Sequence, residues 1–357
     1  MASWSRRNAA LAALLAATLF GNAAQAAQPV KTYKVAWSIY VGWMPWDYAA
    51  QSGILKKWAD KYGIKIELTQ INDYVESINQ YTAGKFDACV MTNMDMLTIP
   101  AAGGVDSTAL IIGDYSNGND GVVLKGAGKK LADIKGQSVN LVELSVSHYL
   151  LARGLASVGL RERDVKVVNT SDADIVGAFK APTVTAAVTW KPLLSEIVSP
   201  TTSLVFDSSK TPGEILDLMV VNTKTLKADP NLAKALVGAW YETLAVMNGK
   251  DARATTAKQA MAKASGTDLK GFEAQLLTTF LYGTPAAGVA AATSADLPVK
   301  MDLVRKFSFD HGLLGKDAKS ADAVGIEFPG GKTLGSAANV KMRFDVSYMK
   351  LAADGKL

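Results

Sequence analysis

Three tryptophans and one carboxylate follow a predicted strand near the start of the chain. The segment 35–48 contains Trp37, Trp43, Trp46 and Asp47. Aromatic faces attract cations, and a fixed carboxylate adds charge-assisted hydrogen bonds. Any one tryptophan could be ordinary core, and Asp47 could simply cap the next helix. Together in one loop they predict the floor of a pocket for a small, flat ligand.

Further polar and aromatic side chains lie where other predicted strands end. In α/β sheets, ligands collect at the carboxyl ends of the strands, so we expect these residues to converge. Each acid also has a structural alternative, because helix caps and turns use the same residue types. The predicted ligand-binding residues are Trp37, Ser38, Trp43, Trp46, Asp47, Asn93, Asp95, Asp120, Glu143, Ser145 and Trp190.

The charge of these loops indicates the kind of ligand. None of the six arginines after residue 26 falls in a predicted strand-end loop, whereas four acids do. A guanidinium would gain paired hydrogen bonds from carboxylates, and an anion would be repelled by them. We therefore expect guanidine, or a neutral relative such as urea. The alternative is an oxyanion such as taurine or nitrate, bound by Ser38, Ser145, Ser147 and backbone N–H groups.

Alternating strand and helix patterns must position these loops. The order of elements predicts an α/β protein in which mostly parallel sheets are flanked by helices. A capping box, Asp73 with Glu76, opens one helix, and Gly53 is a weak point inside another. The expected strands cover 34–39, 64–68, 86–91, 109–114, 138–141, 165–169, 184–189, 204–206 and 216–221; the expected helices cover 46–62, 73–82, 96–102, 148–158, 172–179, 232–247, 268–280 and 297–307.

The first 26 residues have the pattern of an export signal. Arg6 and Arg7 precede an apolar run, and Ala24-Gln25-Ala26 is typical of a cleavage site. Cleavage would leave 357 − 26 = 331 residues, enough for two lobes. The remaining 36 basic and 33 acidic residues give a net charge of +3, too small to indicate nucleic-acid binding. We expect a periplasmic protein.

The scarcity of cysteine and histidine limits the chemistry available. Cys89 is the only cysteine, and His148 and His311 are the only histidines. An intrachain disulfide is therefore impossible, and we expect neither a metal site nor a cofactor. Because no nucleophile–base pair or phosphate-binding loop is evident, we also do not expect an enzyme.

Several motifs together carry a family likeness. They are Trp43-Met-Pro-Trp46, the segments 82–88 and 133–136, and Trp190-Lys-Pro. With the export signal, their order resembles the periplasmic solute-binding proteins of nitrate/taurine-type ABC importers. Within that family the chain is most similar to the branch linked to urea-carboxylase-type enzymes, whose substrates are urea or guanidine.

The resemblance implies a binding protein that works with a membrane permease. Two lobes joined by two hinge crossings would close over a small ligand, and we expect a monomer in solution. The expected division is a signal peptide at 1–26, lobe 1 from 27 to 116, lobe 2 from 117 to 212, and a mainly helical return to lobe 1 from 213 to 357.

Overall fold

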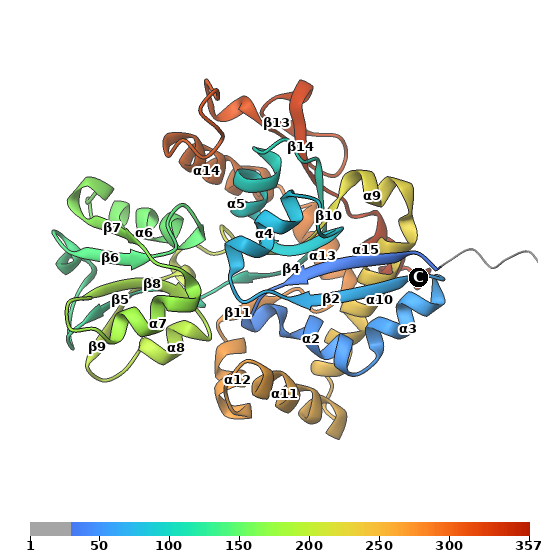
Figure 1. The fold of residues 1–357 in the computed structure, drawn as a ribbon, viewed down its shortest axis with the longest axis horizontal. Helices are drawn as coiled ribbons and strands as arrows, with labels where there is room; N and C mark the ends of the chain where they lie inside the picture. The colour runs from blue at the N-terminus through green and yellow to red at the C-terminus, as the bar shows by residue number, and fades with distance from the viewer. Residues whose placement is uncertain (1–29) are drawn as a thin grey trace, which may run out of the picture. The chain divides into compact units, whose positions relative to one another are not determined.

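The computed structural model describes residues 30–357, so the predicted signal peptide at 1–26 lies outside the described residues. Residues 32–357 form one compact unit. That unit contains two separate sheets with helices on their faces (Figure 1). This is the two-lobed α/β fold expected from the sequence.

A nine-stranded sheet forms the larger lobe, in the order β13-β12-β14-β4-β10-β3-β1-β2, with β11 paired to β4. From β1 the chain moves outward to β2 and then returns past β1 to β3. Right-handed crossovers therefore place the helices of these two connections on opposite faces of the sheet. The strands are β1 (Thr32–Trp37), β2 (Lys65–Gln70), β3 (Ala88–Thr92), β4 (Ser107–Ser116), β10 (Leu216–Asn222), β11 (Thr279–Leu281), β12 (Gly325–Glu327), β13 (Thr333–Leu334) and β14 (Val340–Phe344).

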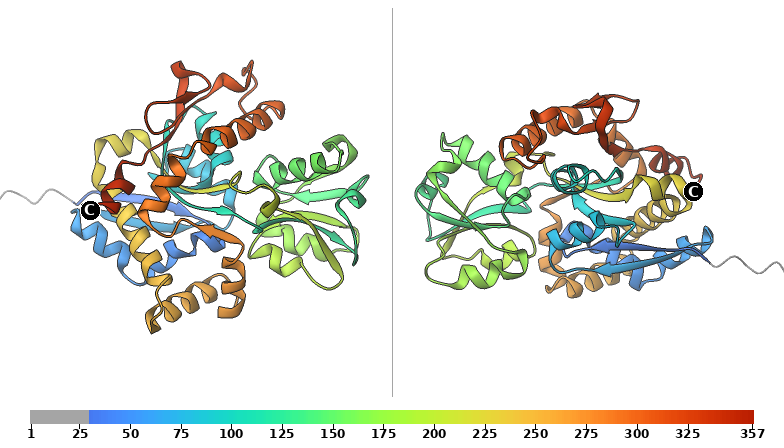
Figure 2. Two further views of the ribbon diagram at one scale, coloured as in Figure 1. Left: turned by 180° about the vertical axis from the view of Figure 1, so that it is seen from behind. Right: turned by 45° about the horizontal axis from the view of Figure 1, so that its top comes forward.

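A five-stranded sheet forms the smaller lobe, in the order β7-β6-β8-β5-β9. Helix α6 covers one face, and α7 and α8 cover the other, as all the views show (Figure 2). The chain enters this lobe between β4 and β5 and leaves it between β9 and β10. The strands are β5 (Asp120–Lys125), β6 (Ser138–Leu141), β7 (Lys166–Asn169), β8 (Ala186–Trp190) and β9 (Thr202–Asp207).

The helices fill the connections and cover the larger sheet. Within residues 30–357, none of them is long and apolar enough to cross a membrane. Their bounds are α2 (Met44–Gln51), α3 (Ile54–Lys61), α4 (Tyr74–Thr82), α5 (Asn93–Met96), α6 (Val146–Ser157), α7 (Asp172–Lys180), α8 (Leu193–Ile197), α9 (Thr223–Ala228), α10 (Pro230–Met247), α11 (Ala252–Ala264), α12 (Leu269–Leu276), α13 (Pro285–Ala292), α14 (Asp296–Asp310) and α15 (Ser347–Ala353).

Three local expectations need correction. Both sheets are mixed rather than mostly parallel, because β10 runs antiparallel to β3 and β4, and β5 runs antiparallel to β8 and β9. The helix expected over 46–62 is two helices, since Gly53 adopts a left-handed φ of 81° between them. The helix expected over 268–280 ends at Leu276, and the chain continues as β11.

The two crossings between the lobes are bonded to each other. The Ser116 hydroxyl lies 2.6 Å from that of Ser208, which also accepts the Gly118 N–H at 2.8 Å. Ser116 donates to Asp120 at the start of β5. The side chain of Asp120 is therefore held where the chain passes between the lobes. The exact domain bounds at 116 and 212 stay a prediction.

Candidate functional site

A small pocket lies where strand ends of both sheets meet. We call it the aromatic pocket; it is lined by Tyr40, Trp43, Tyr74, Thr92, Asp120, Val146, Trp190, Ile215 and Asp217. The pocket has a cavity volume of about 20 Å³. Because about 10–15 Å³ of such volume holds one water molecule, the pocket suits only a very small ligand.

Both lobes supply lining residues. Because β1 and β3 are parallel neighbours, their carboxyl ends lie on one edge of the larger sheet and bring the Tyr40–Trp43 turn next to Thr92. From the smaller lobe, Asp120 and Trp190 are paired residues on β5 and β8. A ligand here would therefore touch both lobes.

Four aromatic rings form a continuous wall. Tyr40 meets Trp43 edge-on at 5.1 Å between ring centroids, and Trp43 lies 5.7 Å from Tyr74. Tyr74 in turn meets Trp190 edge-on at 5.7 Å, which carries the wall from one lobe to the other. These spacings fall in the range of favourable aromatic pairs, so the rings hold one another in place before a ligand arrives.

Two carboxyl groups line the pocket directly. Asp120 and Asp217 are 3% and 4% exposed. Burial raises the pKa of Asp120 to about 6, against the opposing effect of the Ser116 hydrogen bond. Burial and the adjacent Asp114 hold the pKa of Asp217 well above its usual range. Asp217 and Asp114 are opposite each other on β10 and β4, so two carboxyl groups share one buried position.

Two more acids stand behind the aromatic wall. Tyr40 donates to Asp114 at 3.1 Å, and Tyr74 donates to Asp95 at 2.7 Å. Burial raises the pKa of Asp114 to about 7 and that of Asp95 to about 6. Asp114 and Asp217 are hydrogen-bonded to each other through their carboxyl groups, and one oxygen of Asp95 is buried with no hydrogen-bond partner. Asp95 and Asp114 do not line the pocket, so they act on a ligand through Tyr74 and Tyr40 rather than by direct contact.

The pocket lining is acidic and aromatic without a basic partner. Among the residues of the described chain that line it, none is arginine, lysine or histidine. The buried indole N–H of Trp43 has no hydrogen-bond partner. The arrangement can accept several hydrogen bonds from a planar cation and stack on its face.

The predicted site residues fall into three groups. Trp43, Asp120 and Trp190 line the aromatic pocket. Two lie just behind it: Asp95 contacts Tyr74, and Asn93 bonds to the backbone of residues 214 and 216 at the start of β10. The remaining six do not line it: Trp37, Ser38, Trp46, Asp47, Glu143 and Ser145.

Those six have other surroundings. Trp37 is buried in the larger lobe, and Trp46 stacks on Trp240 at 5.0 Å. Asp47 accepts a hydrogen bond from Gln51, and Glu143 is exposed in a separate surface hollow. Ser145 caps α6, and the buried Ser38 hydroxyl has no hydrogen-bond partner. Trp46 and Ser145 thus follow the structural alternatives of core packing and helix capping.

The sequence interpretation missed Tyr40, Tyr74, Thr92, Asp114 and Asp217. A signal for the two acids was present. Both lie in or at the end of apolar segments that were predicted to be buried strands, and a lone acid there is costly unless it has a purpose. No comparable pattern marks Tyr74, because its position depends on how α4 packs beside β3.

Two lobes, two crossings and a pocket at the strand ends define the fold of the periplasmic binding proteins. The alkanesulfonate-binding protein SsuA from Xanthomonas axonopodis pv. citri, bound to MOPS, has a TM-score of 0.67 at 18% identity, over 84% of this chain and 99% of that one. The periplasmic nitrate-binding protein NrtA from Synechocystis PCC 6803 has a TM-score of 0.57 at 13% identity, over 92% and 99%. These likenesses show the fold.

The chain belongs to the NMT1-like family, whose model matches residues 35–262. A curated relative from Brucella abortus, named provisionally as a binding protein, is 30% identical over 101 residues. That match covers 28% of this chain and 31% of the relative, so the chain matches about a third of the relative's length.

Proposed function

We propose that this protein is the periplasmic substrate-binding component of an ABC importer and that it binds guanidine, or alternatively urea. The proposal of a binding protein rests on the family and on the two-lobed fold with a pocket between its lobes. The ligand would be carried to a permease in the inner membrane. No cofactor or catalytic step is part of the proposal.

The observation that carries the choice of ligand is the lining of the aromatic pocket. Asp120 and Asp217 enter it from opposite lobes, the walls are aromatic, and no basic side chain of the described residues lines it. A guanidinium presents N–H groups around its whole edge and a flat face on each side. It can therefore satisfy buried carboxylate oxygens at its edge while its faces stack on rings.

The raised pKa values make this site responsive to a cation. In the ligand-free protein, burial and the neighbouring Asp114 favour the protonated form of Asp217 at neutral pH. A bound cation favours the charged form, so binding at neutral pH is accompanied by the release of protons. Urea carries no charge and would bind without this release, which separates the two ligands experimentally.

An oxyanion is the second candidate. Trp43 offers an unpaired indole N–H, and Val146 places the first turn of α6, a twelve-residue helix, at the pocket. Free N–H groups at a helix start favour anions. The names of SsuA and NrtA refer to sulfonate and nitrate. Against this candidate, Asp120 and Asp217 would repel an anion wherever either one is ionised.

Calorimetry with guanidinium, urea, nitrate and taurine at pH 7.5 tests the proposal. We expect saturable guanidinium binding at concentrations far below denaturing ones, with proton release seen as a dependence of the measured heat on the buffer. A ligand at 100 times its Kd should raise the free energy of unfolding by about 2.7 kcal/mol. Stabilisation by nitrate or taurine alone would overturn the cation proposal, and turnover of any ligand would overturn the binding-protein proposal.

A further inference from the structure

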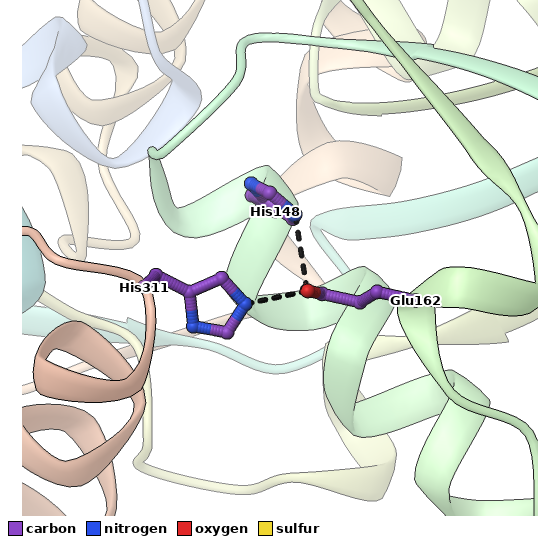
Figure 3. A group of neighbouring side chains, drawn as sticks. All are labelled: His148, Glu162 and His311. Atoms are coloured by element: carbon purple, nitrogen blue, oxygen red, sulfur yellow. Dashed lines mark hydrogen bonds and ion pairs between the residues drawn. The ribbon is translucent and has the colours of Figure 1, made fainter.

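A second cluster of titratable side chains lies outside the aromatic pocket and contains both histidines of the chain. His148 lies on α6, Glu162 on the short turn before β7, and His311 immediately after α14 (Figure 3). The Nε2 atom of His311 is 2.6 Å from Glu162 Oε2, and the Nε2 atom of His148 is 3.0 Å from Oε1. The spacing of the two histidines along the chain does not indicate that they meet.

The cluster joins the two lobes away from the chain crossings. His148 and Glu162 belong to the smaller lobe, since α6 packs on β5 and β8 and the turn leads into β7. His311 belongs to the larger lobe, since α14 packs on α5, with Met301 of α14 touching Asn93 at the end of β3. The contact between Glu162 and His311 therefore links the lobes outside the chain crossings.

Hydrogen-bond partners fix the protons on His311. Its Nδ1 is 2.8 Å from the Phe307 carbonyl oxygen, while Nε2 faces the Glu162 carboxylate. The carbonyl and the ionised carboxylate both accept hydrogen bonds, so the ring makes both bonds only when each nitrogen carries a hydrogen and the ring is a cation. The contact with Glu162 raises the pKa of His311, and the adjacent Asp310 acts in the same direction.

The other two groups fit this arrangement. The Nδ1 atom of His148 accepts the Leu144 backbone N–H at 3.1 Å, so a hydrogen lies on Nε2. That nitrogen is 3.0 Å from Glu162 Oε1 without a hydrogen bond between them. Partial burial alone would raise the pKa of Glu162, but contacts with His148 and His311 lower it to about 2. Glu162 thus stays charged at every pH at which the protein would work.

Metal binding is the competing interpretation, because two histidines and one glutamate offer ligand atoms within 4.8 Å of one another. Zinc sites with two histidines and a glutamate use neutral rings, each with a free lone pair on the ligating nitrogen. His148 already uses the lone pair of Nδ1 to accept the Leu144 N–H. Binding a metal through Nε2 would therefore require a ring without either proton. Protonated side chains therefore explain this cluster better than a bound metal ion does.

Packing connects the cluster to the second crossing between the lobes. The ring of Phe307 stacks on His311 at 4.0 Å and meets Tyr149 edge-on at 5.1 Å. The Tyr149 hydroxyl and the Arg153 guanidinium both bond to Glu214, which closely precedes β10. A change at the cluster can therefore reach the segment about which the lobes would turn.

We propose that Glu162 and His311 form an ionic latch that holds the two lobes together while His311 carries a proton. The latch is present below the pKa of His311 and is lost as pH rises through it, because the neutral ring gives up the charge that Glu162 attracts. Closure in the absence of ligand is therefore greatest at neutral and mildly acidic pH and weakens in alkaline solution. The latch does not depend on the identity of the ligand.

The protonation of His311 is tested by nuclear magnetic resonance. With two histidines in the chain, His148→Asn assigns both imidazole signals. We expect His311 to titrate above the usual value of about 6.5, and its pKa to fall toward that value in Glu162→Gln. Glu143→Gln, which neutralises an exposed acid of the same lobe, should leave the titration unchanged. An equal pKa in Glu162→Gln and wild type would overturn the latch.

Lobe closure is measured separately in ligand-free protein. Spin labels at the exposed positions 56 and 166, introduced as Lys56→Cys and Lys166→Cys, report the distance between α3 and β7. We expect the closed population to fall between pH 6 and pH 9 in wild type, and to be low and independent of pH in Glu162→Gln and His311→Asn. If the distance distribution changes neither with pH nor with either substitution, the latch is refuted, even if guanidinium binds as proposed.

A zinc titration completes the test. We expect no calorimetric binding of Zn²⁺ at micromolar concentrations in wild type. Tight binding that disappears in both Glu162→Gln and His311→Asn would replace the latch with a metal site. Circular dichroism of each variant checks that the fold is kept, and Glu162→Gln alone suffices if His311→Asn does not fold.

Discussion

Replacing Asp120 by asparagine should abolish most cation binding and at the same time stabilise the ligand-free protein. The asparagine side chain keeps the size of the original one and an oxygen that can accept the Ser116 hydrogen bond. It removes the charge that a guanidinium would meet. A hydrogen bond to a charged group contributes about 1.5–3 kcal/mol, so we expect the Kd for guanidinium to rise by about 10- to 150-fold.

The stability gain follows from the raised pKa of Asp120. The pKa is about 6 in the folded protein against an ordinary value of 3.8. Below 3.8 the carboxyl group is protonated in both the folded and the unfolded protein, so burial carries no penalty for charge. Between 3.8 and about 6 the unfolded chain loses its proton first, and above that range the folded state bears the full penalty. At 1.36 kcal/mol per pKa unit, the penalty is about 3 kcal/mol at most, and we expect a gain of about 1–3 kcal/mol at pH 8.

Thermal unfolding of ligand-free protein at pH 4.5 and pH 8, combined with calorimetry, measures both effects. Chemical denaturants are avoided because urea and guanidinium are themselves the candidate ligands. The gain for Asp120→Asn should be larger at pH 8 than at pH 4.5. Asp47→Asn is the matched control, because Asp47 lies outside the aromatic pocket and its side chain bonds to Gln51. Loss of stability in Asp120→Asn with unchanged guanidinium affinity would refute the reasoning.

Four further predictions follow from the same pocket. Guanidinium affinity, measured by calorimetry, should rise about tenfold from pH 5 to pH 8, because one carboxyl group with a pKa of about 6 must ionise to bind the cation. The affinity for an oxyanion would instead fall over this range. Trp190→Leu should weaken guanidinium binding by about 0.5–2 kcal/mol through loss of the aromatic face, measured as Kd at pH 7.5; an unchanged Kd would remove this ring from the site. Glu143→Gln should leave guanidinium affinity unchanged, since this exposed residue does not line the aromatic pocket, and a tenfold loss in the same assay would contradict that placement. Tyr74→Phe should lower the free energy of unfolding by about 1–2 kcal/mol, because Asp95 loses a donor and the Thr92 N–H loses an acceptor; equal melting curves would count against these bonds.

The sequence by itself determined the class of the fold and much of its local structure. Apolar runs of strand length alternate with helical patterns, and this order alone favours helices packed on sheets. The capping pair was specific enough to place a helix start, since Asp73 accepts the Glu76 N–H at 2.8 Å. Of the four tryptophans predicted to bind the ligand, Trp43 and Trp190 line the pocket, whereas Trp37 and Trp46 are buried in the core of the larger lobe.

Only the tertiary structure decided which acids face the pocket and which lie outside it. Asp47, Glu143, Asp120 and Asp217 are all acidic side chains near strand ends or turns, and local sequence cannot rank their burial. That ranking depends on how β10 inserts antiparallel between β3 and β4, and on the two crossings that set Asp120 beside the larger lobe. The meeting of His148, Glu162 and His311 is likewise a product of packing between lobes, because contacts across 149 residues of chain leave no periodic trace in the sequence.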